Sequence, residues 1–94
     1  MSGILGKFTK QPADVLDYDF DYSDWLDDRV DTIATQTVTA DTGITVGTVS
    51  NASGVVKAWI SGGTDGQTYK VTCTMTSAGG RIKQAEISIR VKEV

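Results

Sequence analysis

The strict alternation of apolar side chains and carboxylates in residues 16–22 is the feature that most limits how this chain can fold. One leucine and three aromatic residues occupy every second position, and an aspartate stands between each pair, in the order LDYDFDY. Successive side chains of a strand point to opposite faces of a sheet, so this pattern gives a single apolar face only in a strand and not in a helix. The segment therefore predicts a β-strand with its rings on a core and its aspartates toward water or a partner.

Further segments of the chain also predict strands, and turn residues separate them. Thirteen threonines, ten glycines and a single proline suit short strands joined by glycine turns. The predicted strands are 32–40, 44–50, 55–61, 68–77 and 81–94. In 55–61, bulky residues on both faces indicate a central strand. Six or seven short strands with turns roughly every eight to twelve residues predict an all-β, immunoglobulin-like sandwich of antiparallel strands.

The first residues of the chain lack this alternation. Pro12 also biases the residue before it toward an extended conformation. We therefore expect an extended N-terminal arm over 1–13 and the sandwich domain over 14–94. Removal of residues 1–11 is expected to leave the domain folded and to abolish assembly.

Residues 23–31, SDWLDDRVD, interrupt the alternation after the first predicted strand. They predict a turn or a single helical turn with Ser23 or Asp24 as its cap. We expect Trp25 and Leu26 to close one end of the core. The predicted core also contains Leu16, Phe20, Ile87 and Ile89.

The composition argues against most kinds of chemistry. The chain has 94 residues, enough for one domain, and its net charge is -3. An acidic chain with scattered basic residues does not suit nucleic-acid binding, and no apolar run reaches the roughly 20 residues that span a bilayer. Histidine is absent, which removes histidine-based catalytic triads and imidazole metal ligands. The single cysteine, Cys73, lies on the apolar side of its predicted strand and is expected to be buried.

The acidic segment DYDFDYSDWLDD, residues 17–28, superficially resembles a calcium-binding loop. Its sixth position is Tyr22, where an EF-hand loop needs a glycine for its sharp turn, so an EF-hand is not expected. A looser calcium site between Asp24, Asp27, Asp28 and Asp31 and a neighbouring loop stays open. Paired carboxylates could also hydrolyse glycosides, but they require a cleft that a sandwich of this size does not readily provide. A hydrated acidic surface is the favoured interpretation.

Two aromatic residues in the second half of the chain receive specific interpretations. Tyr69 stands at the start of a late strand, like the tyrosine corner of immunoglobulin-like sandwiches, in which the hydroxyl bonds to backbone upstream. Trp59 packs in the core or anchors an interface. The core is the favoured place for it.

FTKQPADVLDYDFDYSDWL near the start and AWISGGTDGQTYKVTCTMTSAGGRIKQAEISIRVKEV at the end resemble a family of small tailed-bacteriophage virion proteins described as fibre-tail adaptors. The similarity covers nearly the whole chain. Its most characteristic pieces are DYDFDYSDWL and the hairpin WISGGTDGQTYKVT...AGGR. The resemblance implies an immunoglobulin-like sandwich in the virion that joins a fibre to the tail or neck, without catalysis. It supplies no catalytic or ligand residues.

We therefore expect a non-enzymatic structural protein of the bacteriophage virion. It would be made in the host bacterial cytoplasm, act in many copies and bind tail fibre and tail or neck proteins, with no cofactor, metal, nucleic acid or membrane. A capsid decoration protein and a carbohydrate- or calcium-binding receptor module are the alternatives. The expected interface residues are Ile4, Leu5, Phe8, Pro12, Asp17, Asp19, Asp21 and Trp59.

Overall fold

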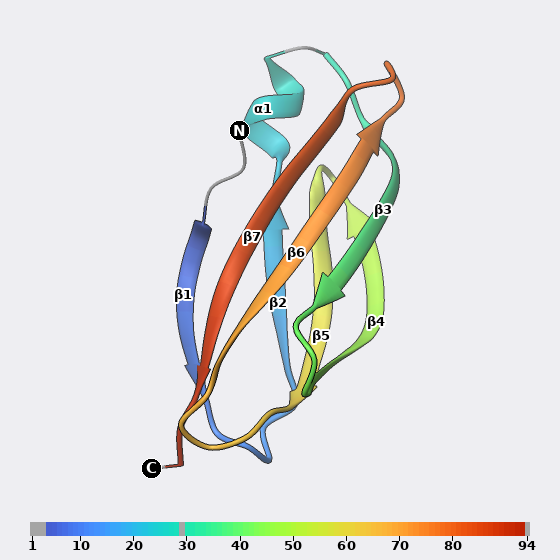
Figure 1. Ribbon diagram of the computed structural model, residues 1–94. Coiled ribbons are helices and arrows are strands. Elements are labelled where there is room, and N and C mark those ends of the chain that lie inside the picture. Colours follow the sequence, from blue (N-terminus) through green and yellow to red (C-terminus); the bar gives the residue numbers. More distant parts are fainter. Residues whose placement is uncertain (1–3, 29, 94) are drawn as a thin grey trace.

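The computed structural model describes residues 4–28 and 30–93, which form an elongated molecule of 43 × 24 × 19 Å (Figure 1). Strands make up most of it, and the short helix lies at one end of the long axis. In chain order the elements are β1 (Ile4–Lys10), β2 (Leu16–Asp21), α1 (Ser23–Asp27), β3 (Ile33–Ala40), β4 (Ile44–Ala52), β5 (Val55–Gly62), β6 (Thr68–Ser77) and β7 (Ile82–Val91). Within the described residues, no helix is long and apolar enough to cross a lipid bilayer.

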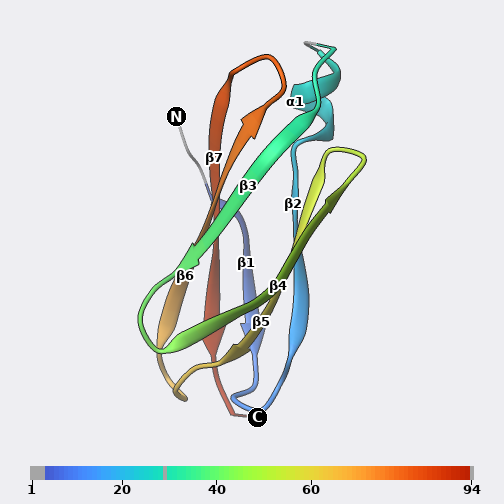
Figure 2. The same cartoon turned by 90° about the vertical axis from the view of Figure 1, so that its right-hand side faces the viewer.

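The strands form two sheets that pack face to face (Figure 2). One sheet has the order β1-β7-β6-β3 and the other the order β2-β5-β4. An immunoglobulin constant-type domain places its second, fifth and fourth strands in one sheet and its third, sixth and seventh in the other. The two sheets have this same division, so the predicted all-β sandwich is confirmed and its strand order is immunoglobulin-like. The predicted central position of β5 is also confirmed.

The segment expected as an arm contains a strand. Residues 4–10 form β1, which pairs with β7 in parallel, whereas the other strand pairs are antiparallel. In the described part of β1, Gly6, Phe8 and Lys10 share one side of the strand. Because two of these three residues are a glycine and a lysine, β1 lacks the apolar alternation from which the other strands were predicted. Lys10 is 1% exposed.

The backbone of the β1–β2 turn surrounds the buried Lys10 ammonium group. Nζ donates to the carbonyl oxygen of Gln11 at 2.7 Å, to that of Asp14 at 3.0 Å and to that of Pro12 at 3.4 Å. A buried charged group is costly unless its hydrogen bonds are satisfied. These three carbonyl oxygens therefore allow a lysine to point inward where the period of two would normally place an apolar residue.

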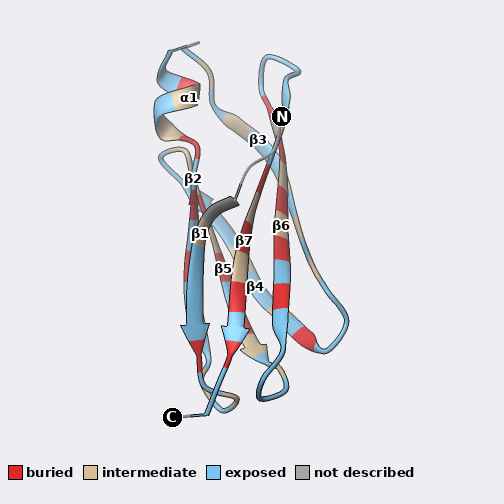
Figure 3. Ribbon diagram, turned by 60° about the vertical axis from the view of Figure 1, so that its left-hand side comes forward, coloured by how far each residue is buried: buried red, intermediate tan, exposed pale blue. Residues whose placement is uncertain are grey.

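The core consists of the alternate residues of the strands on both inner faces (Figure 3). Phe20, Ile87 and Ile89 are fully or almost fully buried, as predicted, and Cys73 is buried. Leu16 was placed in the core wrongly, since its side chain is 40% exposed. It is the first residue of β2, an edge strand, so too few neighbours surround it to exclude water.

Two tyrosine hydroxyl groups form hydrogen bonds with the backbone, one within a loop and one between distant segments. The backbone N–H of Thr64 donates to the Tyr69 hydroxyl at 2.9 Å, which confirms the tyrosine corner. The buried Tyr22 hydroxyl donates to the Cys73 carbonyl oxygen at 3.1 Å and thereby connects the two sheets. Burial, followed by this hydrogen bond, raises the pKa of Tyr22 well above its usual range.

Helix α1 closes one end of the sandwich. Leu26 is buried, and Trp25 packs against the core while the Lys83 ammonium lies 5.8 Å from its ring centroid. The predicted cap is wrong, because the residue at the N-cap position is Tyr22 and it makes no side-chain capping bond. The Ser23 hydroxyl instead donates to Asp21 at 2.6 Å.

Candidate protein interface

The outward side of the β2-β5-β4 sheet brings together four of the predicted interface residues. Asp17 stands opposite Trp59 in the β2–β5 register, Asp19 opposite Lys57, and Asp21 opposite Val55. The alternate residues of both strands are buried, so these side chains share the solvent side of the sheet. We call this surface the acidic face.

The three aspartates of the acidic face have different surroundings. Asp17 forms an ion pair with Lys57, whose Nζ lies 3.2 Å from Oδ2, and both side chains are partly exposed. Asp21 accepts hydrogen bonds from the Ser23 hydroxyl and backbone N–H, which lower the pKa of its carboxyl group. Within the described residues, no ion pair includes Asp19. Its carboxylate is therefore available to a positive group on a partner.

Trp59 supplies the large apolar group of the acidic face. Its side chain is 41% exposed, so it is not the core residue that the sequence favoured. The β4–β5 register shifts between Val46 and Val49, and a Cβ added to Gly47 there would lie 3.7 Å from the Trp59 Cβ. The glycine therefore adds no side chain beside the base of Trp59. A half-exposed tryptophan next to charged residues is a typical anchor of protein interfaces.

The other four predicted interface residues lie elsewhere. Ile4 and Leu5 belong to β1, but their side chains lie outside the described part of the structure. Phe8 is 40% exposed and packs its ring on Tyr18, and Pro12 is partly buried in the β1–β2 turn. The structure therefore separates the predicted set into the acidic face and a group along β1 and the turn after it.

The outer side of the β1-β7-β6-β3 sheet is a second candidate surface that we did not identify from the sequence. Threonines stand opposite each other at every second position of β3 and β6, as Thr35 and Thr76, Thr37 and Thr74, and Thr39 and Thr72. Basic side chains lie toward its other edge, where Lys7 of β1 and Arg90 of β7 line a shallow hollow with Thr68. We call this surface the basic face. The threonines alternate visibly in the sequence, but only the pairing of β3 with β6 shows that they adjoin.

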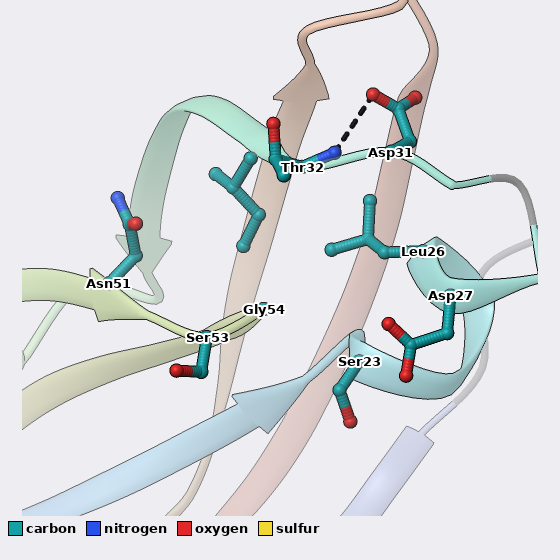
Figure 4. A pocket seen from close by; sticks show the side chains of 9 residues that line it. Ser23, Leu26, Asp27, Asp31, Thr32, Asn51, Ser53 and Gly54 are labelled. Carbon is teal, nitrogen blue, oxygen red and sulfur yellow. Dashed lines mark hydrogen bonds between the residues drawn. The ribbon is translucent and has the colours of Figure 1, made fainter.

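A hollow of about 440 Å³ opens at the end of the sandwich that α1 covers (Figure 4). One side of the hollow is lined by α1, through Ser23, Leu26 and Asp27. The remaining lining comes from the loop after α1 and the start of β3, through Asp31, Thr32 and Ile33, and from the β4–β5 turn, through Asn51, Ser53 and Gly54. The described residues contain no group of three acidic or cysteine side chains that could hold a metal ion, so the structure does not bring Asp24, Asp27, Asp28 and Asp31 together as a set of ligands.

Asp31, the most enclosed acid of this hollow, is held by surrounding donors. Its Oδ1 accepts from the backbone N–H of Thr32 at 2.9 Å and of Gly79 at 3.0 Å, and Oδ2 pairs with Arg81 at 2.9 Å. The Ser77 side chain and then these groups lower its pKa to about 2, against the opposing effect of desolvation. The carboxylate therefore joins the loop after α1 to the β6–β7 turn and is ionised at neutral pH.

Comparison with known protein families identifies a match over most of the chain. A protein-family model described as "Podophage GP4 fiber-tail adaptor protein gp77" matches residues 10–90. This range runs from the end of β1 almost to the end of β7 and so includes the acidic face. No curated protein matches the chain.

Proposed function

This chain belongs to the podophage fibre-tail adaptor family, and from this premise we propose that it joins a tail fibre to the tail or neck of the virion through protein contacts alone. The protein would be made in the host bacterium and act in many copies without catalysis or a cofactor. The observation that supports this role most directly is the acidic face, on which Asp17 stands opposite the half-exposed Trp59 and Asp19 and Asp21 follow along β2.

The chemistry of the acidic face suits a protein partner. A half-exposed indole contributes a large contact area at low entropic cost, and surrounding charges set the orientation of the partner. The hollow beside it, lined by Asp19, Ser50, Asn51, Ala52, Val55 and Lys57, is shallow and mixes polar with apolar groups. A shallow surface of mixed polarity is typical of protein interfaces, whereas sites for small ligands are enclosed and mostly apolar.

Uptake of the purified chain into particles tests this function. Particles of the phage that lack the chain are incubated with wild type, Trp59→Ala or Asp19→Asn, and the amount that sediments with the particles is measured. We expect Trp59→Ala to reduce uptake by about tenfold or more, as loss of an interface anchor does. Asp28→Asn is the matched control, because Asp28 is exposed and lies at the end of α1, outside both broad faces of the sandwich.

The location of the bound protein distinguishes the adaptor from its alternatives. Binding to tailed particles and to purified tail, neck or fibre protein supports the proposed function. Binding to tailless capsids alone would make the chain a decoration protein. Uptake that is equal for Trp59→Ala, Asp19→Asn and wild type would exclude the acidic face as the interface.

A further inference from the structure

The two broad faces of the sandwich carry opposite charge. The outward positions of β2, β5 and β4 include Asp17, Asp19 and Asp21 against one base, Lys57. The described outward positions of the other sheet contain the opposite arrangement, with Lys7, Lys70 and Arg90 against one acid, Glu86. Since Lys57 pairs with Asp17, and Lys70 lies 3.9 Å from Glu86, the described part of each face keeps unpaired charge of a single sign.

The unpaired charges of the two faces lie along the same long edge of the molecule. Phe8 and Tyr18 are in ring contact, so β1 runs beside β2 although the two strands belong to different sheets. Lys7 and Asp19 each adjoin one of these rings in sequence and point out of opposite faces. A second copy in the same orientation, placed on top of the first, therefore brings the aspartates of β2 over the basic side chains of β1 and β7.

We propose that copies of this chain stack head to tail, with the acidic face of one copy on the basic face of the next. This inference rests on the proposed function, because it assigns a second copy of the chain as the partner of the acidic face. Unlike charges across the contact would orient the copies, and like charges would oppose a stack in which two acidic faces meet.

The apolar parts of the two faces also match in this arrangement. Trp59 lies on β5, one strand inward from the acidic edge, and in the stack it falls over β7 and β6 of the next copy. There the outward residues of β6 are mostly threonines, which are rigid at χ1 and present methyl groups. Because the two contacting surfaces differ, the contact is heterologous and continues until the copies close into a ring or end on another protein.

Sedimentation velocity of the purified full-length chain over a range of concentrations tests the stack. We expect self-association that weakens as salt rises from about 0.02 M to about 0.5 M. Asp19→Lys and Arg90→Glu alone are each expected to weaken association by about tenfold or more. An equal mixture of the two variants should associate again, because the two introduced charges are opposite in sign and meet at one contact, while the next contact is wild type. Asp28→Lys, outside both faces, is the matched control.

Each outcome decides between the stack and its alternatives. A wild-type chain that is monomeric at every concentration and salt overturns the inference, and so does association that both reversals leave unchanged or that the mixture does not restore. Asp19 and Arg90 are both exposed, so neither substitution is expected to disturb the fold. Circular dichroism of the variants checks this. If the chain stays monomeric while Trp59→Ala still blocks uptake into particles, the stack is wrong and the adaptor function stands. If the chain self-associates as expected but does not bind to particles, the stack stands and the adaptor function is wrong.

Discussion

The rings of Phe8 and Tyr18 meet across the edge of the sandwich, with centroids 5.0 Å apart and planes inclined by 56°. Phe8 belongs to one sheet and Tyr18 to the other, so the contact closes this edge of the core. Phe8→Ala is expected to lower the free energy of unfolding by about 1 to 3 kcal/mol, less than for a fully buried ring because Phe8 is partly exposed.

Urea denaturation measures this loss, and Tyr18→Phe provides the matched control. The Tyr18 hydroxyl is buried without a hydrogen-bond partner among the described residues, so its removal should leave stability unchanged or raise it slightly. A Phe8→Ala variant as stable as wild type would show that the ring contact contributes nothing.

Truncation of the chain tests the larger role of β1. The sequence led us to expect that the domain folds without residues 1–11, but the structure leads to the opposite prediction. Removal of this segment would unpair the outer edge of β7, expose the Tyr18 ring and delete Lys10. We expect the truncated chain to lose several kcal/mol, about half or more of the stability of a domain of this size, and to unfold at a much lower urea concentration. An unchanged unfolding midpoint would restore the interpretation of this segment as a dispensable arm.

The two apolar residues of β2 that the sequence assigned to the core should now differ in their response to truncation. Phe20 has no exposed surface, so Phe20→Ala is expected to cost about 3 to 5 kcal/mol. Leu16 is 40% exposed, and Leu16→Ala is expected to cost about 1 kcal/mol or less. Thermal or urea unfolding of both variants measures the difference. Equal losses would mean that Leu16 is covered in solution by something other than the described chain.

The elements that alternate clearly were predictable, because the period of two depends only on neighbours in sequence. The strands 68–77 and 81–94 correspond to β6 and β7, and the interval between the predicted strands 44–50 and 55–61 contains Ser53 and Gly54, both with positive φ. Strand β1 could not be predicted in this way. Its inward lysine is satisfied by turn carbonyl oxygens that the sequence does not reveal.

The interface residues were predictable one by one, but their arrangement was not. Asp17 and Trp59 are 42 positions apart in the sequence, and only the pairing of β2 with β5 makes them neighbours. Strand pairing depends on the whole fold, since a shift by one residue would turn Trp59 into the core. The same limit hid the basic face, where Lys7 and Arg90 adjoin through the parallel pairing of β1 with β7.

Asp31 predicts a loss of stability in acid. Its pKa in the folded protein is about 2, below the usual value of 3.8, so the ionised carboxylate stabilises the fold above about pH 4. This contribution is lost as the pH falls from about 4 to about 2, because protonation then removes the hydrogen bonds from Ser77 and the neighbouring donors. Urea midpoints measured across this range should fall steeply for wild type and less for Asp31→Asn. Asp28→Asn, at the exposed end of α1, is the matched control variant, and equal slopes for Asp31→Asn and wild type would contradict the assignment.

Val30 predicts a gain of stability from a single substitution. Its N–H donates to Asp27 O at 3.1 Å and the next N–H, of Asp31, donates to Leu26 O at 3.0 Å, which is the Schellman pattern that ends a helix. The residue at this position is left-handed, with φ 50°, and is usually a glycine, whereas a β-branched residue is strained there. The Val30 side chain is 95% exposed, so Val30→Gly should remove strain at little loss of burial and raise the free energy of unfolding by about 1 kcal/mol. Val30→Ala keeps the Cβ and should recover only part of this gain. If glycine and alanine gave the same stability, the strain would come from the branched side chain and not from the left-handed backbone.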